Sequence, residues 1–205
     1  GLATIDWTIV WKPMVMGTAF FVGHWLTFGA IRRGDVSLVT PLMGTKVVFV
    51  ALGVVVLSGK VPSVPLWIAA FLTTLGIFVM GLGDLKGGSR LFFTIAVTLA
   101  SALVFGVSDV LVSTWARGFG AMPFLAVGSG TVAVWSLLMW FCQGRPVFFP
   151  KGPGSGWAWA GAIFIAVQAM VMGIGLALFD DATGINIVYA SRGLWVIALV
   201  VLFGH

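Results

Sequence analysis

The chain has 205 residues, of which 60% are hydrophobic and 8% are charged, and all six of its acidic residues are Asp. A soluble domain is about half apolar and about a quarter charged, so this chain has too few polar side chains to cover a surface that faces water. Its net charge of +5 would suggest nucleic acid for a soluble protein, but in so apolar a chain it indicates loops that lie against anionic lipid. The composition therefore excludes an ordinary soluble enzyme or a nucleic-acid-binding domain, and it predicts a membrane protein.

Runs of about 20 mostly apolar residues are long enough to cross a bilayer as helices. The sequence contains seven such runs, at 11–31, 36–58, 64–83, 91–112, 121–142, 157–179 and 184–204, separated by short connectors such as "RRGD", "GKVPS" and "WARGFG". Strands of a membrane barrel would be about half as long and would alternate in polarity. We therefore expect an all-α polytopic membrane protein, a bundle of seven spans in the cell inner (plasma) membrane.

The second span is interrupted by helix-breaking residues in "VTPLMGTKVVFV". Pro41 has no N–H, so the carbonyl of Ser37 loses its helical partner, and Gly44 follows within one turn. In lipid a broken helix is tolerated only beside protein or water. We therefore predict a helix break at Pro41 and Gly44, with a simple kink whose polar groups are satisfied internally as the alternative.

Two cations lie deep within apolar spans, Lys46 in the second and Arg192 in the last. A charge at the bilayer centre costs about 2.5–3.5 kcal/mol on insertion scales. Three explanations stay open: snorkelling toward the headgroups, polar pairing or water without a substrate, and a wet cavity shared with an anionic substrate. For the third explanation, the candidate substrate-binding residues are Lys46, Arg192, Thr45, Asn186, Tyr189, Ser191 and Trp195.

Asp109 and His24 are the candidate coupling residues. Asp109, in "GVSDVLVS", is the acid nearest to a span interior and lies one turn inside the end of the predicted span 91–112. It could accept a coupling proton if burial favoured its neutral form, and a structural pair with Arg117 or a Lys is the alternative. His24 lies mid-span and titrates near neutrality when unperturbed, with a hydrogen-bonded packing role as the alternative.

The chain offers no pattern typical of a metal or cofactor site. Cys142 is the single cysteine, and the spacing of His24 and His205 does not match a zinc site. No cleavable signal peptide is evident after Gly1. We expect no cofactor and no metal, and we expect that both ends of a longer protein are missing.

Two segments of the chain can be aligned as an internal repeat. "DVSLVTPLMG" (35–44) aligns with "GINIVYASRG" (184–193), and each segment opens a span that carries a buried cation. An odd number of helices per repeat makes the two halves inverted, a layout common in transporters with a site near the midplane. We predict the remainder of one repeat within residues 1–84 and most of a second within residues 85–205.

The stretches "FGAIRRGDVSLVTPLMGTKVVFVALGVVVLSGKVPSVPLWIAAFLTTLGIFVMG" and "LALFDDATGINIVYASRGLWVIALVVLFG" carry a resemblance to a known family. The chain resembles EamA-type members of the drug/metabolite transporter superfamily. The resemblance implies ten helices in two five-helix repeats, of which the seven spans would be helices three to nine. One departure is the turn after the fourth helix, where the family usually shows a Glu and this chain reads "SGKVPS".

These observations favour a secondary active transporter, either importer or exporter, of a small organic metabolite. The two cations favour an anionic solute, bound by alternating access at a midplane cavity. We expect a small-molecule solute and membrane lipid as partners, no nucleic acid, and leave a homodimer open. The alternatives are a membrane-embedded enzyme acting on a lipid or peptide, for which Ser129 has only His24 as a base, and a non-transporting membrane scaffold.

Overall fold

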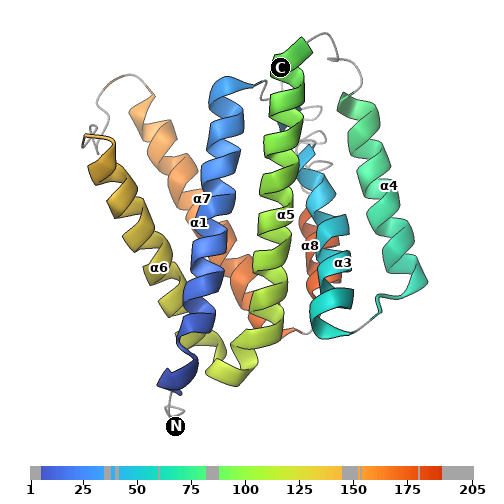
Figure 1. The fold of residues 1–205 in the computed structure, drawn as a ribbon, viewed down its shortest axis with the longest axis vertical. Coiled ribbons are helices and arrows are strands. Elements are labelled where there is room, and N and C mark those ends of the chain that lie inside the picture. Colours follow the sequence, from blue (N-terminus) through green and yellow to red (C-terminus); the bar gives the residue numbers. More distant parts are fainter. Residues whose placement is uncertain are drawn as a thin grey trace. The chain divides into compact units, whose positions relative to one another are not determined.

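The computed structural model describes residues 6–34, 38–39, 42–59, 61–81, 88–144, 152, 154–179 and 181–190. The described residues form helices, and no β-strand occurs among them. In chain order the elements are η1 (Trp7–Ile9), α1 (Trp11–Arg33), η2 (Met43–Thr45), α3 (Lys46–Ser58), α4 (Val64–Gly81), α5 (Gly88–Phe119), α6 (Ala121–Cys142), α7 (Ser155–Leu178) and α8 (Ala182–Ala190) (Figure 1). The described part of the chain is therefore all-α, as the sequence predicts.

Several of these helices have the length and composition of membrane spans. Within the described residues, four helices are long and apolar enough to cross a membrane: Trp7–Arg33, Leu91–Phe119, Ala121–Cys142 and Ser155–Leu178. On α7, large apolar side chains such as Phe164 and Val171 are exposed. A surface of this kind is favourable in lipid and costly in water, so the helices fit a membrane protein.

One predicted connector is helical. The predicted span 91–112 is followed by the connector "WARGFG" in the sequence analysis, but α5 continues through these residues to Phe119. Arg117 lies in the last turn of α5, where a cation interacts favourably with the helix dipole, so the helix extends beyond its apolar run. The turn to α6 is reduced to Gly120, whose φ of 96° lies in a region that favours glycine.

The second predicted span, 36–58, is not one continuous α-helix. A 3₁₀ turn, η2, precedes α3, which begins at Lys46. α3 ends at Gly59, which has a φ of 65° and donates its N–H to the carbonyl of Val55 at 3.1 Å. This is a left-handed glycine C-cap, and it makes α3 only 13 residues long.

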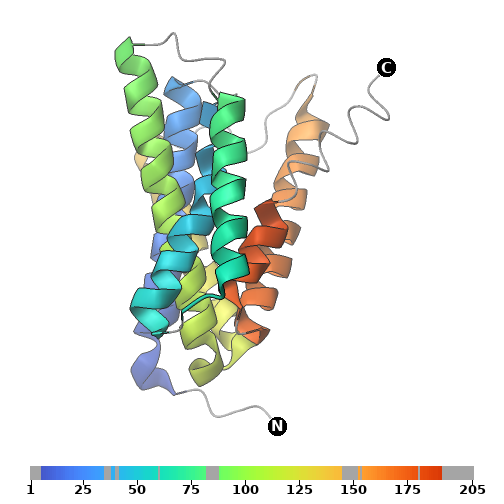
Figure 2. The ribbon, with the colours of Figure 1, turned by 90° about the vertical axis from the view of Figure 1, so that its right-hand side faces the viewer.

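The chain divides into two compact units, and the candidate site lies in the unit formed by residues 22–110 and 181–205. Within this unit α3, α4 and α8 contact one another, as Figure 2 shows in cyan, green and red. Gly106 of α5 lies against Phe49 of α3, and Gly23 of α1 lies against the ring of Phe105. Glycines at these contacts let helix backbones approach closely, as is common for helices in membranes.

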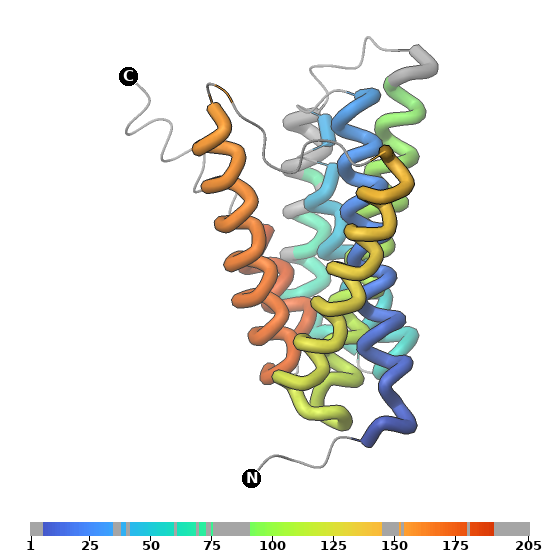
Figure 3. The backbone as a smooth tube through the Cα atoms, turned by 90° about the vertical axis from the view of Figure 1, so that its left-hand side faces the viewer, coloured from blue at the N-terminus to red at the C-terminus, as the bar shows by residue number. Residues whose placement is uncertain are grey.

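The other unit comprises residues 1–21 and 111–180. Its helices α6 and α7 contact each other, as Figure 3 shows in yellow and orange. Trp135 of α6 donates its indole N–H to the hydroxyl of Thr18 at 3.0 Å, and the carbonyl of Gly128 lies close to Gly17. These contacts join α6 to the first turns of α1.

Asp6 caps the short helix η1 at the start of this second unit. Its Oδ1 accepts from the Thr8 hydroxyl at 2.6 Å and from the Thr8 backbone N–H at 3.0 Å. These two hydrogen bonds hold the pKa of the exposed Asp6 carboxyl below its ordinary value. The first turn of the chain therefore carries a negative charge beside the start of α1.

Candidate functional site

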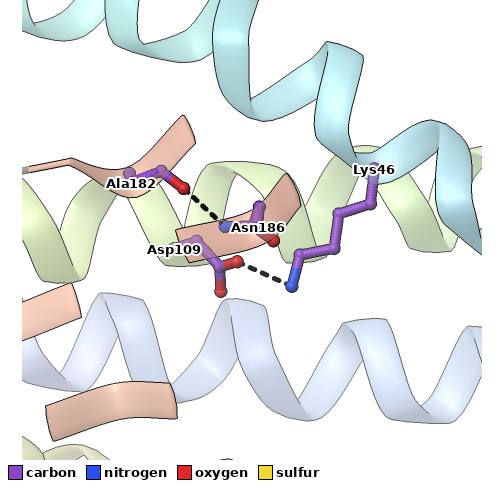
Figure 4. A network of polar contacts seen from close by, with 4 residues as sticks. All are labelled: Lys46, Asp109, Ala182 and Asn186. Atoms are coloured by element: carbon purple, nitrogen blue, oxygen red, sulfur yellow. Dashed lines mark hydrogen bonds and ion pairs between the residues drawn. The ribbon is translucent and has the colours of Figure 1, made fainter. Parts of the chain in front are cut away.

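The most deeply placed charges in the described residues form an ion pair. Lys46 is the first residue of α3, and Asp109 lies within α5. Lys46 Nζ lies 2.6 Å from Asp109 Oδ2, and Figure 4 shows the two side chains reaching toward each other from different helices. Lys46 is 8% exposed and Asp109 is 4% exposed. Each charge is thus compensated by the other inside the protein.

The Lys46–Asp109 pair corrects two points of the sequence analysis. Asp109 was expected one turn from the end of its helix, but the longer α5 places it in the helix interior. Snorkelling was one explanation left open for Lys46, and it is wrong, because the ammonium points at a buried carboxylate. Of the alternatives for Asp109, the structure shows a pair with a lysine.

Two aromatic rings complete the surroundings of the Lys46 ammonium. Nζ lies 5.7 Å from the ring centroid of Phe105, one turn before Asp109 on α5, and 5.4 Å from that of Tyr189 on α8. A cation within about 6 Å of an aromatic face is attracted by the ring quadrupole. The contact with Oδ2 is a close charge contact that does not have the geometry of a hydrogen bond. Electrostatic attraction therefore dominates the site.

Asn186 brings an unused hydrogen-bond acceptor to the same region. It lies one turn before Tyr189 on α8, so the two side chains share a helix face, and Figure 4 shows it beside the ion pair. Its Nδ2 donates to the carbonyl of Ala182 at 2.9 Å, while Oδ1 has no hydrogen-bond partner among the described residues. Asn186 is 1% exposed, and an unsatisfied buried acceptor costs about 1–3 kcal/mol.

A row of buried hydroxyl groups lies along α5 toward the ion pair, and it was not among the predicted site residues. Thr94, Thr98, Ser101 and Ser108 are all buried and recur at spacings of three, four and seven, which place them on one helix face. Ser101 donates to the Gly23 carbonyl at 2.8 Å and lies 2.7 Å from the Thr27 hydroxyl. Thr98 Oγ1 and Ser108 Oγ have no hydrogen-bond partner among the described residues. The helical spacing of these hydroxyls was the signal that could have found them.

The remaining predicted site residues fall into two groups. Thr45 and Gly44 lie in η2, where the Thr45 hydroxyl donates to the Leu42 carbonyl at 2.7 Å. The His24 and Phe105 rings pack edge to face, with centroids 4.8 Å apart. Pro41, Ser191, Arg192 and Trp195 lie outside the described residues. The structure therefore groups Lys46, Asp109, Asn186 and Tyr189 from three separate helices.

The chemistry of this grouping is that of charge recognition. A carboxylate, an ammonium group, an amide oxygen and two aromatic faces can bind a charged group or exchange charged partners. Among the described residues, no cluster of three His, Cys, Asp or Glu side chains could hold a metal ion. Asp109 and Lys46 are the groups here that can gain or lose a proton together with a change of partner.

Comparison of the chain with protein-family models, with curated proteins and with solved structures found no match. The resemblance to EamA-type transporters stays a prediction based on the residues that carry it. An assignment of function therefore depends on the chemistry of the Lys46–Asp109 pair and its surroundings.

Proposed function

We propose that the chain is an EamA-type secondary active transporter of a small organic solute in the cell inner membrane, and that the Lys46–Asp109 pair lies at its solute site. The observation that carries this proposal is a buried ion pair beside Oδ1 of Asn186, which has no hydrogen-bond partner among the described residues. Buried polar atoms in proteins are almost always hydrogen-bonded, and an exception calls for a specific explanation. A site that exchanges partners during transport provides one.

The energetics of buried ion pairs support a functional role. The cost of removing two charges from water can exceed their mutual attraction, so an apolar pair of similar volume is often as stable or more stable. Ionisable residues at membrane depth mark substrate or proton pathways by default. The Lys46–Asp109 pair is buried in this way among apolar helices, so a requirement for stability alone explains it poorly.

The backbone beside the pair also supports this proposal. α3 begins at Lys46, directly after the 3₁₀ turn η2. Helices that are interrupted at membrane depth are typical of transporter binding sites, where they change shape between the outward-open and inward-open states. A change in the winding of η2 would move Lys46 relative to Asp109, which links the ion pair to alternating access.

The charge pair gives two ways to bind a solute. An anionic solute would take the place of Asp109 beside Lys46, which requires that Asp109 accept a proton. A cationic solute would take the place of Lys46 beside Asp109. Either exchange couples solute binding to a proton, so a proton gradient can drive the transport.

The test is solute flux in liposomes that contain the purified full chain. Solutes are first chosen by a thermal-stabilisation screen of organic anions, amines and neutral metabolites, since a ligand that binds the native state raises its apparent stability. We expect flux of a stabilising solute, and we expect that flux to be abolished in the double variant Lys46→Met with Asp109→Leu, which removes both charges together.

Ser136→Ala serves as the matched control, because Ser136 is exposed on α6 and its hydroxyl donates only to the nearby Val132 carbonyl at 2.8 Å. Its flux should equal that of the wild type. Unchanged flux in the charge-free double variant, with normal insertion, would overturn the assignment of the site. Stabilisation by solutes without any flux would indicate a membrane scaffold instead.

A further inference from the structure

We propose that the place occupied by Lys46 Nζ is a binding site for an organic ammonium group, which the protein's own lysine fills in the state described. The site consists of the Asp109 carboxylate and the rings of Phe105 and Tyr189, and Figure 4 shows Asn186 beside the ion pair, although its Oδ1 is not hydrogen-bonded to Lys46 Nζ. The inference rests on the proposed function, since the solute site is the same, and it names the charge of the solute. It differs from the anion that the sequence alone favours.

Three described groups near Nζ attract a cation. Asp109 Oδ2 lies 2.6 Å away and the two ring centroids lie 5.4 and 5.7 Å away. A carboxylate combined with aromatic faces is the arrangement that recognises ammonium ligands in proteins. The ammonium of Lys46 demonstrates that a group of this size and charge is accommodated.

The hydrogen-bonding groups beside the ion pair also suit a ligand that donates hydrogen bonds. An ammonium group carries N–H donors and no acceptor, whereas a carboxylate or phosphate accepts only. Asn186 Oδ1 is a buried acceptor without a partner in the described part of the chain, while Nδ2 donates one hydrogen bond to the Ala182 carbonyl. An anion in this place would therefore meet a second acceptor, and it would require Asp109 to take up a proton. The hydroxyl of Ser108 can both donate and accept, so it does not discriminate.

Charge balance determines what happens to Lys46 when the solute binds. With the solute's ammonium beside Asp109, a charged Lys46 would be a second, uncompensated cation in an apolar interior, which is costly. Lys46 must then leave as the neutral amine, and its proton passes to solvent. The exchange is one solute ammonium bound for one proton released.

The other titratable groups near the pair do not take part in this balance. Tyr189 on α8 presents its ring face to Nζ. His24 on α1 packs against the Phe105 ring, with 4.8 Å between the ring centroids. From α5 the facing charge is Asp109, and from α3 it is Lys46. A released proton is therefore assigned to Lys46.

The experiment uses the purified full chain in detergent micelles, with n-propylammonium chloride as the probe. Sodium propionate and sodium chloride at equal ionic strength are the comparison salts. Thermal unfolding reports binding, and a pH indicator in weakly buffered solution reports protons. We expect propylammonium, but neither comparison salt, to raise the unfolding temperature, with release of one proton per bound ammonium.

Substitutions at Lys46 distinguish binding of the ammonium from release of the proton. Lys46→Met removes the internal competitor, so propylammonium should bind about tenfold more tightly or better, without proton release. Lys46→Arg keeps a cation that does not lose its proton, so propylammonium should neither bind nor release protons. Lys12→Met is the matched control, since Lys12 also lies near two rings, those of Trp11 and Trp115 at 5.9 and 5.8 Å. This variant should behave as the wild type does.

Two results would overturn the inference. Stabilisation by propionate with proton uptake would assign the site to an anion. If propylammonium stabilised Lys46→Met but had no effect on the wild type, the site would bind only the protein's own lysine and would not be a solute site. Failure of the proposed function can be told apart from failure of this inference. Propylammonium binding with proton release but without flux in liposomes would support the ammonium site and contradict the transporter. Lys46-dependent flux of an anion would support the transporter and contradict the ammonium site.

Discussion

Gly106 of α5 lies in close contact with Phe49 of α3, and these two helices carry the ion pair. A Cβ built on Gly106 would lie 3.0 Å from the Phe49 Cβ and 3.3 Å from the Val50 backbone nitrogen. One turn further along, Gly53 of α3 lies against Val110 of α5, so the two helices run in the same direction. At the same offset Lys46 would lie level with Leu103, and Asp109 is six residues, about 9 Å, further along α5. The ammonium therefore reaches Asp109 by extending its stem along α5.

We expect Gly106→Val to push α3 away from α5 and to disrupt the Lys46–Asp109 pair. Overpacking of a close helix contact typically costs about 1–3 kcal/mol. The free energy of unfolding in detergent should fall by this amount, and solute binding should weaken as well, because the pair depends on the approach of the two helices.

Gly118→Ala on the same helix is the control for this substitution. A Cβ on Gly118 would meet nothing within 4 Å, and Ala is favoured over Gly in a helix by about 1 kcal/mol. This variant should be as stable as the wild type or more stable. A Gly106→Val protein with wild-type stability and binding would show that the α3–α5 contact does not set the geometry of the site.

The two charges should be strongly coupled in a double-mutant cycle. Lys46→Met or Asp109→Leu alone leaves a buried charge without a partner, and each should lower the free energy of unfolding by about 3–5 kcal/mol. The double variant leaves no charge, so its stability should return close to that of the wild type or exceed it. Equilibrium unfolding of the four proteins gives the coupling free energy. Additive effects would contradict the mutual compensation inferred for the pair.

Asn186→Leu should separate solute binding from stability. Within the residues that the structure describes, the side chain has one hydrogen bond, from Nδ2 to the Ala182 carbonyl of its own helix, and Oδ1 has no partner. Replacing it with an apolar side chain of similar volume removes an unsatisfied buried acceptor worth about 1–3 kcal/mol, so stability should hold or rise. Propylammonium binding should weaken, because the acceptor for the ammonium is lost.

Val188→Leu on the same helix is the comparison variant, since Val188 is 73% exposed. It should change neither stability nor binding. If Asn186→Leu instead unfolded more easily and bound propylammonium normally, the amide would have a structural role and Oδ1 would not contact the solute.

Part of the candidate site can be predicted from the sequence. Lys46 stands out because a cation in an apolar span needs compensation, and Asn186 and Tyr189 stand out as polar groups in another apolar segment. The sequence also offers a pair of Asp109 with Arg117 or a lysine, but it does not identify Lys46 as that lysine, and it places Asp109 too close to a helix end because Arg117 and two glycines are typical of a connector. Phe105 and Ser108 read as ordinary helix packing, because neither has an unusual local sequence.

Composition and hydropathy by themselves determined that this chain is helical and suited to lipid, because an apolar backbone in a membrane must satisfy its hydrogen bonds within each segment. They also determined that the charge of Lys46 needed a counterpart. Only the tertiary structure decided that the counterpart is Asp109, that two aromatic rings lie near the ammonium, and that Asn186 lies beside the pair. These contacts join α3, α5 and α8 across long stretches of chain, and such pairings depend on how helices pack, which no local pattern encodes.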